Sequence, residues 1–234
     1  MLDSTGFVDD SSTRLMRALA EELKLPLMQI SRSAELGQLD GGDNLQTIET
    51  TASNALRLLD GYILTTQLMG EQQQLEIEPV SVTAVLYDTA QDLYKLSRLY
   101  DTKLDIRVNG KCGQVMSNAR ALRAALASIA YTFVSSGISS KQQIMLTASK
   151  SNRGVITGVS SDNCQFSAQE LQLARKLYGN ARQPAKTMTS NSGAGVYLAD
   201  RLFEAMESRL KFGHYRGNVG LFAWLMASQQ LTLL

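Results

Sequence analysis

Few residues in this sequence can do chemistry. The chain of 234 residues has one histidine, His214, which lies in Phe212-Gly213-His214-Tyr215-Arg216-Gly217. The glycines on either side of His214 predict a surface turn between two late strands, which is an ordinary place for a histidine that does no chemistry. Two adjacent carboxylates, Glu21 and Glu22, form a second candidate group. They also fit the solvated side of an amphipathic helix.

Two later segments contain residues that could contact a ligand. Gly193 and Gly195 stand where a predicted helix begins, and the backbone amides at such a start can bind phosphate. A loop of serine and glycine that only caps the helix explains the same residues equally well. Asp162 follows a predicted strand, where an aspartate either contacts a ligand or belongs to an ordinary loop.

Two amphipathic helical segments, joined near Gly41-Gly42, must position the carboxylate pair. In the second segment the residues that follow a 3,4 spacing are Leu45, Ile48, Ala52, Ala55, Leu59, Tyr62, Thr66 and Met69. This spacing predicts one mostly apolar seam along the helix. Two such helices with a short turn make an antiparallel hairpin. A second copy would bury the remaining apolar surface in a four-helix bundle, so we expect a homodimer.

The rest of the chain mixes strands and helices. The predicted strands are 75–80, 103–108, 143–149, 154–160, 209–212 and 219–226. The predicted helices follow Ser81 and then cover 118–136, 167–178 and 195–208. This order favours a two-layer α/β sandwich. We therefore expect an α+β protein with a flexible lead-in at 1–10, a helical hairpin at 11–70 and a sandwich at 71–234.

Several segments resemble one known family. Ala20-Glu21-Glu22-Leu23-Lys24-Leu25-Pro26-Leu27 resembles the H-box of sensor histidine kinases, usually Ser-His-Glu-Leu-Arg-Thr-Pro-Leu, on the first helix of their dimerisation and phosphotransfer domain. The segment 75–80 is similar to the junction with their ATP-binding domain. The resemblance covers nearly the whole chain. It implies a dimeric four-helix bundle followed by a sandwich of the histidine-kinase and gyrase ATPase type.

The resemblance also implies that the chemistry of the family is lost. Glu21 stands at the place of the phosphoacceptor histidine, and a carboxylate lacks the imidazole nitrogen that attacks the γ-phosphate. In the segment similar to the N-box, Ser128 and Thr132 replace the two asparagines that bind Mg²⁺, and Ser135 replaces the basic residue. Hydroxyl groups are poor Mg²⁺ ligands, so we expect no metal site.

The nucleotide boxes are kept only in part. Asp162-Asn163-Cys164-Gln165-Phe166 resembles the G1 box, with Cys164 and Phe166 in place of both glycines. Gly193 and Gly195 match the glycines of the G2 box. The resemblance thus implies a degenerate nucleotide pocket at Asp162, Thr132, Gly193 and Gly195. We expect no cofactor, and binding of ATP with Mg²⁺ is the alternative.

Composition narrows the class of protein. The chain has 23 basic and 22 acidic residues and a net charge of +1, which gives no field that attracts nucleic acid or a membrane surface. Cys112 and Cys164 are its two cysteines, which fits free thiols in a reducing compartment. Neither a leader segment nor a run of about 20 apolar residues occurs, so we expect a cytoplasmic protein.

These observations favour a catalytically inactive relative of histidine kinases, a pseudokinase. It would act in two-component-type signalling as a dimeric scaffold or regulator that binds a response regulator or another histidine kinase. A fixed negative charge at Glu21 that imitates the phosphorylated state is a hypothesis within this reading. The alternative is a histidine-kinase-like protein that still binds ATP or works as the phosphotransfer partner of an active kinase. A purely structural dimer is the third class.

Overall fold

The computed structural model describes residues 5–40, 44–69, 75–136, 142–162, 167–175, 194–215 and 217–228. Its helices are α1 (Thr5–Asp40), α2 (Leu45–Met69), α3 (Val82–Leu99), α4 (Ala119–Ser136), α5 (Ala168–Arg175) and α6 (Ala194–Ala205). Its strands are β1 (Glu78–Val80), β2 (Lys103–Asn109), β3 (Val115–Ser117), β4 (Gln143–Ser151), β5 (Gly154–Ser161), β6 (Lys211–Tyr215) and β7 (Asn218–Met226).

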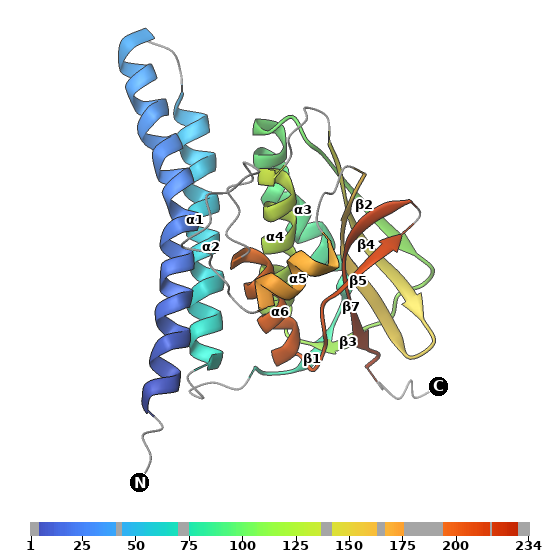
Figure 1. Ribbon diagram of the computed structural model, residues 1–234. Helices are drawn as coiled ribbons and strands as arrows, with labels where there is room; N and C mark the ends of the chain where they lie inside the picture. The colour runs from blue at the N-terminus through green and yellow to red at the C-terminus, as the bar shows by residue number, and fades with distance from the viewer. Residues whose placement is uncertain are drawn as a thin grey trace.

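The molecule has a helical hairpin, a layer of helices and a sheet, in that order across its width (Figure 1). Helices α1 and α2 form the hairpin, and α4 and α6 lie between it and the sheet. The predicted architecture of a helical hairpin followed by an α/β sandwich is therefore confirmed. Among the described residues, no helix is both long and apolar enough to cross a membrane.

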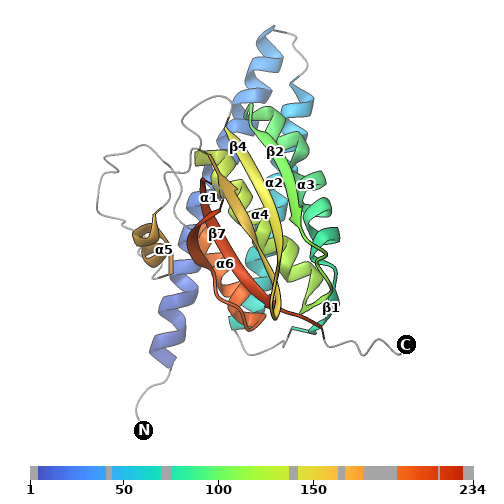
Figure 2. The same cartoon turned by 90° about the vertical axis from the view of Figure 1, so that its right-hand side faces the viewer.

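The main sheet is mixed, with strand order β2-β4-β5-β7-β6. Strands β2 and β4 run parallel, and the other neighbouring strands are antiparallel. Figure 2 views this sheet with the helices behind it. The core lies between the sheet and α4, where Leu122, Leu126 and Ile129 have no exposed surface, as the periodicity of that helix predicts.

Several boundaries differ from the predictions. Helix α1 begins at Thr5, inside the lead-in expected at 1–10, because a helix gains one backbone hydrogen bond for each residue it adds and does not have to stop at the first serine. Strand β1 covers only Glu78–Val80, and its partner β3 was not predicted because three residues give too little pattern. Helix α5 covers Ala168–Arg175, and the last residues of the helix predicted at 167–178 lie outside the described ranges.

His214 lies in a strand, so the prediction of a turn was wrong. It pairs with Val219 across β6 and β7, and Tyr215 pairs with Asn218. The tight turn is possible because Gly217 adopts a φ of +86°, which glycine tolerates without strain. This single glycine lets both strands extend toward the turn. The exposed imidazole of His214 packs edge-on against Phe212, with ring centroids 5.7 Å apart.

Candidate functional site

The candidate site lies where helix α1 of the hairpin meets the beginning of helix α6. The side chain of Glu22 is only 8% exposed and points from α1 into this contact. Its Oε1 accepts a hydrogen bond of 3.0 Å from the backbone N–H of Gly195, and its Oε2 accepts one of 3.2 Å from the hydroxyl of Tyr62 on α2. One carboxylate therefore connects both hairpin helices to the sandwich.

The N–H of Gly195 belongs to the first turn of α6, where amide groups have no partner within the helix. Such a helix start also has a partial positive charge that stabilises an anion. The carboxylate of Glu22 therefore does here what a bound anion would do. The reading of Glu22 as a solvated residue was wrong, because its partner in the sandwich is 173 positions away in the sequence.

Tyr62 completes the contact from the side of α2. Burial raises the pKa of its phenol well above the ordinary value, and the negative charge of Glu22 raises it further. The phenol therefore stays neutral and acts as a hydrogen-bond donor to Glu22. The sequence offered one signal for this role, a tyrosine in an apolar seam, since a buried hydroxyl needs a polar partner.

The segment of α4 that resembles the N-box lies directly against Gly195. A Cβ added to Gly195 would be 2.7 Å from the hydroxyl oxygen of Thr132 and 3.3 Å from the carbonyl oxygen of Ser128. The two helices approach this closely only because residue 195 has no side chain. The hydroxyl of Thr132 donates to the carbonyl of Ser128, with an oxygen–oxygen distance of 2.9 Å. The structure thus brings together Glu22, Thr132 and Gly195.

Asp162 has a structural position at the end of β5. Its Oδ1 accepts a hydrogen bond of 3.0 Å from the N–H of Gln143 and one of 3.4 Å from the hydroxyl of Ser161. Its own N–H donates to the carbonyl of Gln143 at 3.3 Å. These bonds join the ends of β4 and β5. None of these hydrogen bonds joins Asp162 to Glu22 or Gly195.

Most of the other predicted site residues have side chains that the structure does not describe. Glu21 lies in α1, but its side chain is outside the described part of the structure, as are Gly193, Cys164 and Phe166. Ser135 donates to the carbonyl of Thr132 at 3.3 Å and so lies beside the same segment of α4.

The described ranges contain no group of three or more His, Cys, Asp or Glu that could hold a metal ion. Cys112 is a free, half-buried thiol, and burial raises its pKa.

Comparisons by sequence find no matching family model and no matching curated protein. Comparison by structure finds the histidine kinase AdeS of Acinetobacter baumannii, with a TM-score of 0.56 and 12% identity over 89% of this chain and 98% of that chain. Full-length ShkA in complex with AMPPNP gives a TM-score of 0.57 and 16% identity, over 92% of this chain and 46% of that chain. A bacterial phosphotransferase gives a TM-score of 0.50 and 12% identity, over 95% of this chain and 98% of that chain.

At these identities the comparisons establish the fold. The chain has the fold of the histidine kinase core, with its helical hairpin and its ATPase-type sandwich. This confirms the resemblance at the level of architecture.

Proposed function

We propose that this chain is a catalytically inactive, histidine-kinase-like protein that acts in two-component-type signalling as a dimeric scaffold or regulator. The observation that carries the proposal is the contact of Glu22 with Gly195 at the start of α6, at 3.0 Å. In a chain with this fold and the G2-like glycines, that helix start is where backbone amides would bind a phosphate. Here a side chain of the same protein already accepts the hydrogen bond.

The occupied helix start opposes nucleotide binding for an electrostatic reason. A phosphate brought to the same amide would face the carboxylate of Glu22 in a buried, weakly screened environment, where like charges repel strongly. Displacing Glu22 would also leave the hydroxyl of Tyr62 without its acceptor. Nucleotide binding would therefore require the loss of two hydrogen bonds and a movement of α1 away from α6.

The residues at the phosphoacceptor place and at the metal place agree with this proposal. Glu21 has no imidazole with which to accept a phosphoryl group. Ser128 and Thr132 supply hydroxyls where the family has asparagines, and the hydroxyl of Thr132 is already bonded to the helix backbone. Each step of phosphotransfer thus lacks a required group.

A second candidate function is a histidine-kinase-like protein that still binds ATP, or that works as phosphotransfer partner of an active kinase. The preserved Gly195, which lets α6 approach α4 closely, favours it. In this version Glu22 would leave the start of α6 when the nucleotide arrives. Titration of ATP with and without Mg²⁺ distinguishes the two functions, because only the second predicts saturable heat and a raised unfolding temperature.

The proposed partners are inferred from the surface of the hairpin, where apolar side chains are exposed to solvent. The exposed large hydrophobic residues of α1 and α2 are Met16, Leu27, Met28, Leu36, Leu45, Leu56 and Ile63. A second copy of the hairpin would cover such a surface in a four-helix bundle. The remaining hairpin surface would receive a response regulator or another histidine kinase.

Labelling with γ-³²P-ATP tests the loss of catalysis. We expect no stable label on the wild-type protein and none on Glu21→His, because restoring the imidazole does not restore nucleotide binding. An active histidine kinase labelled in parallel serves as the positive control. Label on Glu21→His alone would show that the ATP site works and would favour the second function. Stable label on the wild type would overturn the proposal.

Measurement of the molar mass in solution tests the dimer. We expect Leu56→Glu combined with Ile63→Glu to convert the dimer to a monomer, because charges buried in the interface between two hairpins lose hydration. Tyr87→Glu, on the exposed side of α3, is the matched control and should leave the mass unchanged. A wild-type protein that is monomeric at all concentrations would contradict the dimer.

A further inference from the structure

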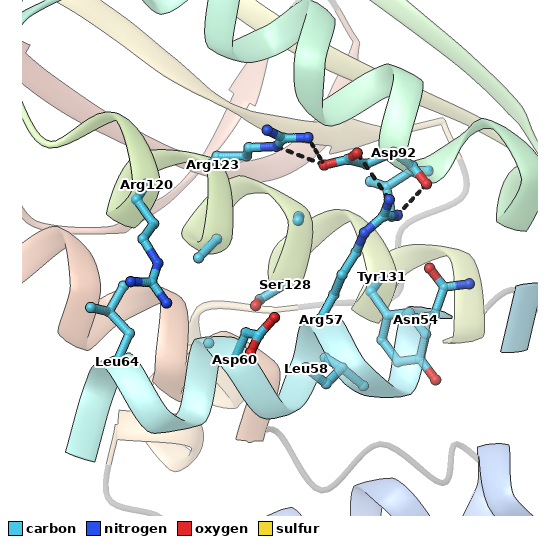
Figure 3. A pocket seen from close by; sticks show the side chains of 14 residues that line it. Asn54, Arg57, Leu58, Asp60, Leu64, Asp92, Arg120, Arg123, Ser128 and Tyr131 are labelled. Atoms are coloured by element: carbon cyan, nitrogen blue, oxygen red, sulfur yellow. Dashed lines mark hydrogen bonds and ion pairs between the residues drawn. The ribbon is translucent and has the colours of Figure 1, made fainter. Parts of the chain in front are cut away.

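A second contact between the hairpin and the sandwich contains a cavity of about 250 Å³. It lies between α2 on one side and α3 and α4 on the other (Figure 3). Its lining residues come from all three helices, so the cavity exists only while the hairpin is docked on the sandwich. Its volume is below the range of about 300–1,000 Å³ that is usual for pockets of drug-sized ligands, so it suits a compact molecule.

The residues that line the cavity include more arginines than acidic residues. The arginines are Arg57, Arg120 and Arg123, and the acidic residues are Asp60 and Asp92, so the lining has a formal charge of +1. Asp92 is shared by two of the arginines: its Oδ1 is 2.9 Å from Nη2 of Arg57, and its Oδ2 is 2.6 Å from Nη2 of Arg123.

Two charged groups at the cavity remain without an ion pair. Within the described part of the chain, neither Arg120 nor Asp60 makes a hydrogen bond or a salt bridge, and both residues are exposed, so they lie at the rim of the cavity. Figure 3 shows the guanidinium of Arg120 beside Leu64 and the carboxylate of Asp60 one turn earlier on α2, with the hydroxyl of Ser128 directed toward Asp60. A donor of charge-assisted hydrogen bonds and an acceptor therefore stand on the same side of one small cavity.

The floor of the cavity is apolar. Leu58, Leu64 and Leu93 line it, and each is at most 6% exposed. Ala124 and Ala127 supply small side chains on the α4 wall and leave space open. An apolar group placed here would lose contact with water without displacing a polar group of the protein.

We propose that this cavity binds a compact zwitterion with an aliphatic group, of the α-amino acid class. The carboxylate of the ligand pairs with the free guanidinium of Arg120, and its ammonium pairs with Asp60. The aliphatic group packs on the leucines of the floor. A simple anion fits less well because Asp60 repels it, and a simple cation fits less well because the arginines repel it.

Binding at this cavity has a consequence for the arrangement of the two domains. The ligand contacts the hairpin through Asp60 and the sandwich through Arg120, so it binds the docked arrangement better than a separated one. An amino acid would thereby favour docking of the hairpin. This inference needs neither the missing phosphoacceptor nor the dimer, and it can fail or succeed independently of them.

Calorimetric titration of the full chain tests the proposal, with L-leucine as the probe. 4-Methylpentanoate lacks the ammonium, 3-methylbutylamine lacks the carboxylate, and inorganic phosphate is a plain anion. We expect saturable binding of L-leucine and at least tenfold weaker binding of the other three. Arg120→Gln should weaken the binding of L-leucine at least tenfold, because a charge-assisted hydrogen bond is lost.

Two further variants make the test specific. Asp60→Asn should weaken the binding of L-leucine at least tenfold, because the ammonium of the ligand loses its partner. The same change should strengthen the binding of 4-methylpentanoate, because the carboxylate that repels this anion is removed. Arg153→Gln, an exposed arginine in the turn between β4 and β5, is the matched control and should change nothing. Absence of binding up to about 10 mM L-leucine, equal binding of phosphate, or binding that Arg120→Gln leaves unchanged would each overturn the proposal.

Discussion

Two of the contacts between the hairpin and the sandwich differ in how completely their polar groups are satisfied. At the start of α6, both oxygens of Glu22 have donors and the side chain is 8% exposed. At the cavity of about 250 Å³ between α2, α3 and α4, the single carboxylate of Asp92 forms ion pairs with two guanidinium groups. The first contact is closed and holds the two parts together. The second leaves donors and volume that a ligand can use.

The largest effect is expected from Glu22→Ala at the closed contact. The change leaves the hydroxyl of Tyr62 and the N–H of Gly195 buried without partners, and each such group costs about 1–3 kcal/mol. We expect the free energy of unfolding to fall by about 2–4 kcal/mol, measured by urea denaturation. Glu35→Ala, an exposed glutamate on the same helix, is the control and should change it by under about 0.5 kcal/mol.

A result for Glu22→Ala close to that of Glu35→Ala would contradict the closed contact. It would mean that water reaches Tyr62 and Gly195 once the carboxylate is removed. Glu22→Gln sharpens the test, because its amide oxygen can still accept one of the two hydrogen bonds. We expect it to retain part of the stability that Glu22→Ala loses.

The next effect concerns the close approach of α6 to α4. Gly195→Ala would place a Cβ 2.7 Å from the hydroxyl of Thr132, which forces the two helices apart. Alanine is the better helix former by about 1 kcal/mol, so the net destabilisation should be about 1–2 kcal/mol. Thr132→Ala removes the clashing atom, and a double-mutant cycle should therefore show a favourable coupling.

The cycle has a clear negative outcome. If Gly195→Ala and Thr132→Ala have additive effects on the free energy of unfolding, the two residues do not touch and the packing described here is wrong. Gly113→Ala, where an added Cβ meets no atom within 4 Å, is the control for the loss of backbone freedom.

Tyr62 makes the closed contact sensitive to alkaline pH. Because burial and Glu22 raise its folded-state pKa, its stabilising effect is complete below the unfolded-state pKa near 10 and is lost as pH rises above it. One such group lowers the free energy of unfolding by about 1.4 kcal/mol for each pH unit above 10. Tyr62→Phe should remove this contribution to the dependence of the free energy of unfolding on pH, between about pH 9 and pH 11.

Tyr87→Phe serves as the control, because Tyr87 is 60% exposed. Burial also raises the pKa of Tyr131. The free energy of unfolding of Tyr62→Phe should therefore still fall somewhat at alkaline pH. An unchanged slope in Tyr62→Phe would show that the phenol ionises freely in the folded protein.

The fold was largely predictable because its elements have strong local patterns. The seam of α2 and the inner face of α4 repeat apolar residues at helical spacing, and β2 alternates Leu104 and Ile106 with charged residues. Each pattern follows from residues close in sequence. The exception is the short strand β3, which pairs with β1 through only three residues.

The candidate site was predictable only in part, because its contacts join distant segments. Gly195 and Thr132 could be identified from motifs, but the burial of Glu22 depends on α6. The cavity between α2, α3 and α4 could not be predicted for the same reason, since Arg57, Asp92 and Arg123 come from three different helices. Spacing along the chain says nothing about such groups until the helices are packed.

The smallest effect is expected at the second contact, beside the cavity, from Asp92→Asn. It removes the charge shared by Arg57 and Arg123. The side chain of Asp92 is 14% exposed, whereas those of the two arginines are 40% and 45% exposed and remain hydrated. We expect a loss of about 0.5–1 kcal/mol that shrinks in 1 M salt, because exposed ion pairs are weak and screened. Asp88→Asn, on the exposed side of α3, is the matched control. If Asp92→Asn cost as much as Glu22→Ala, the ion pairs of the second contact would stabilise the fold as strongly as the hydrogen bonds of Glu22, and the contrast between the two contacts would not hold.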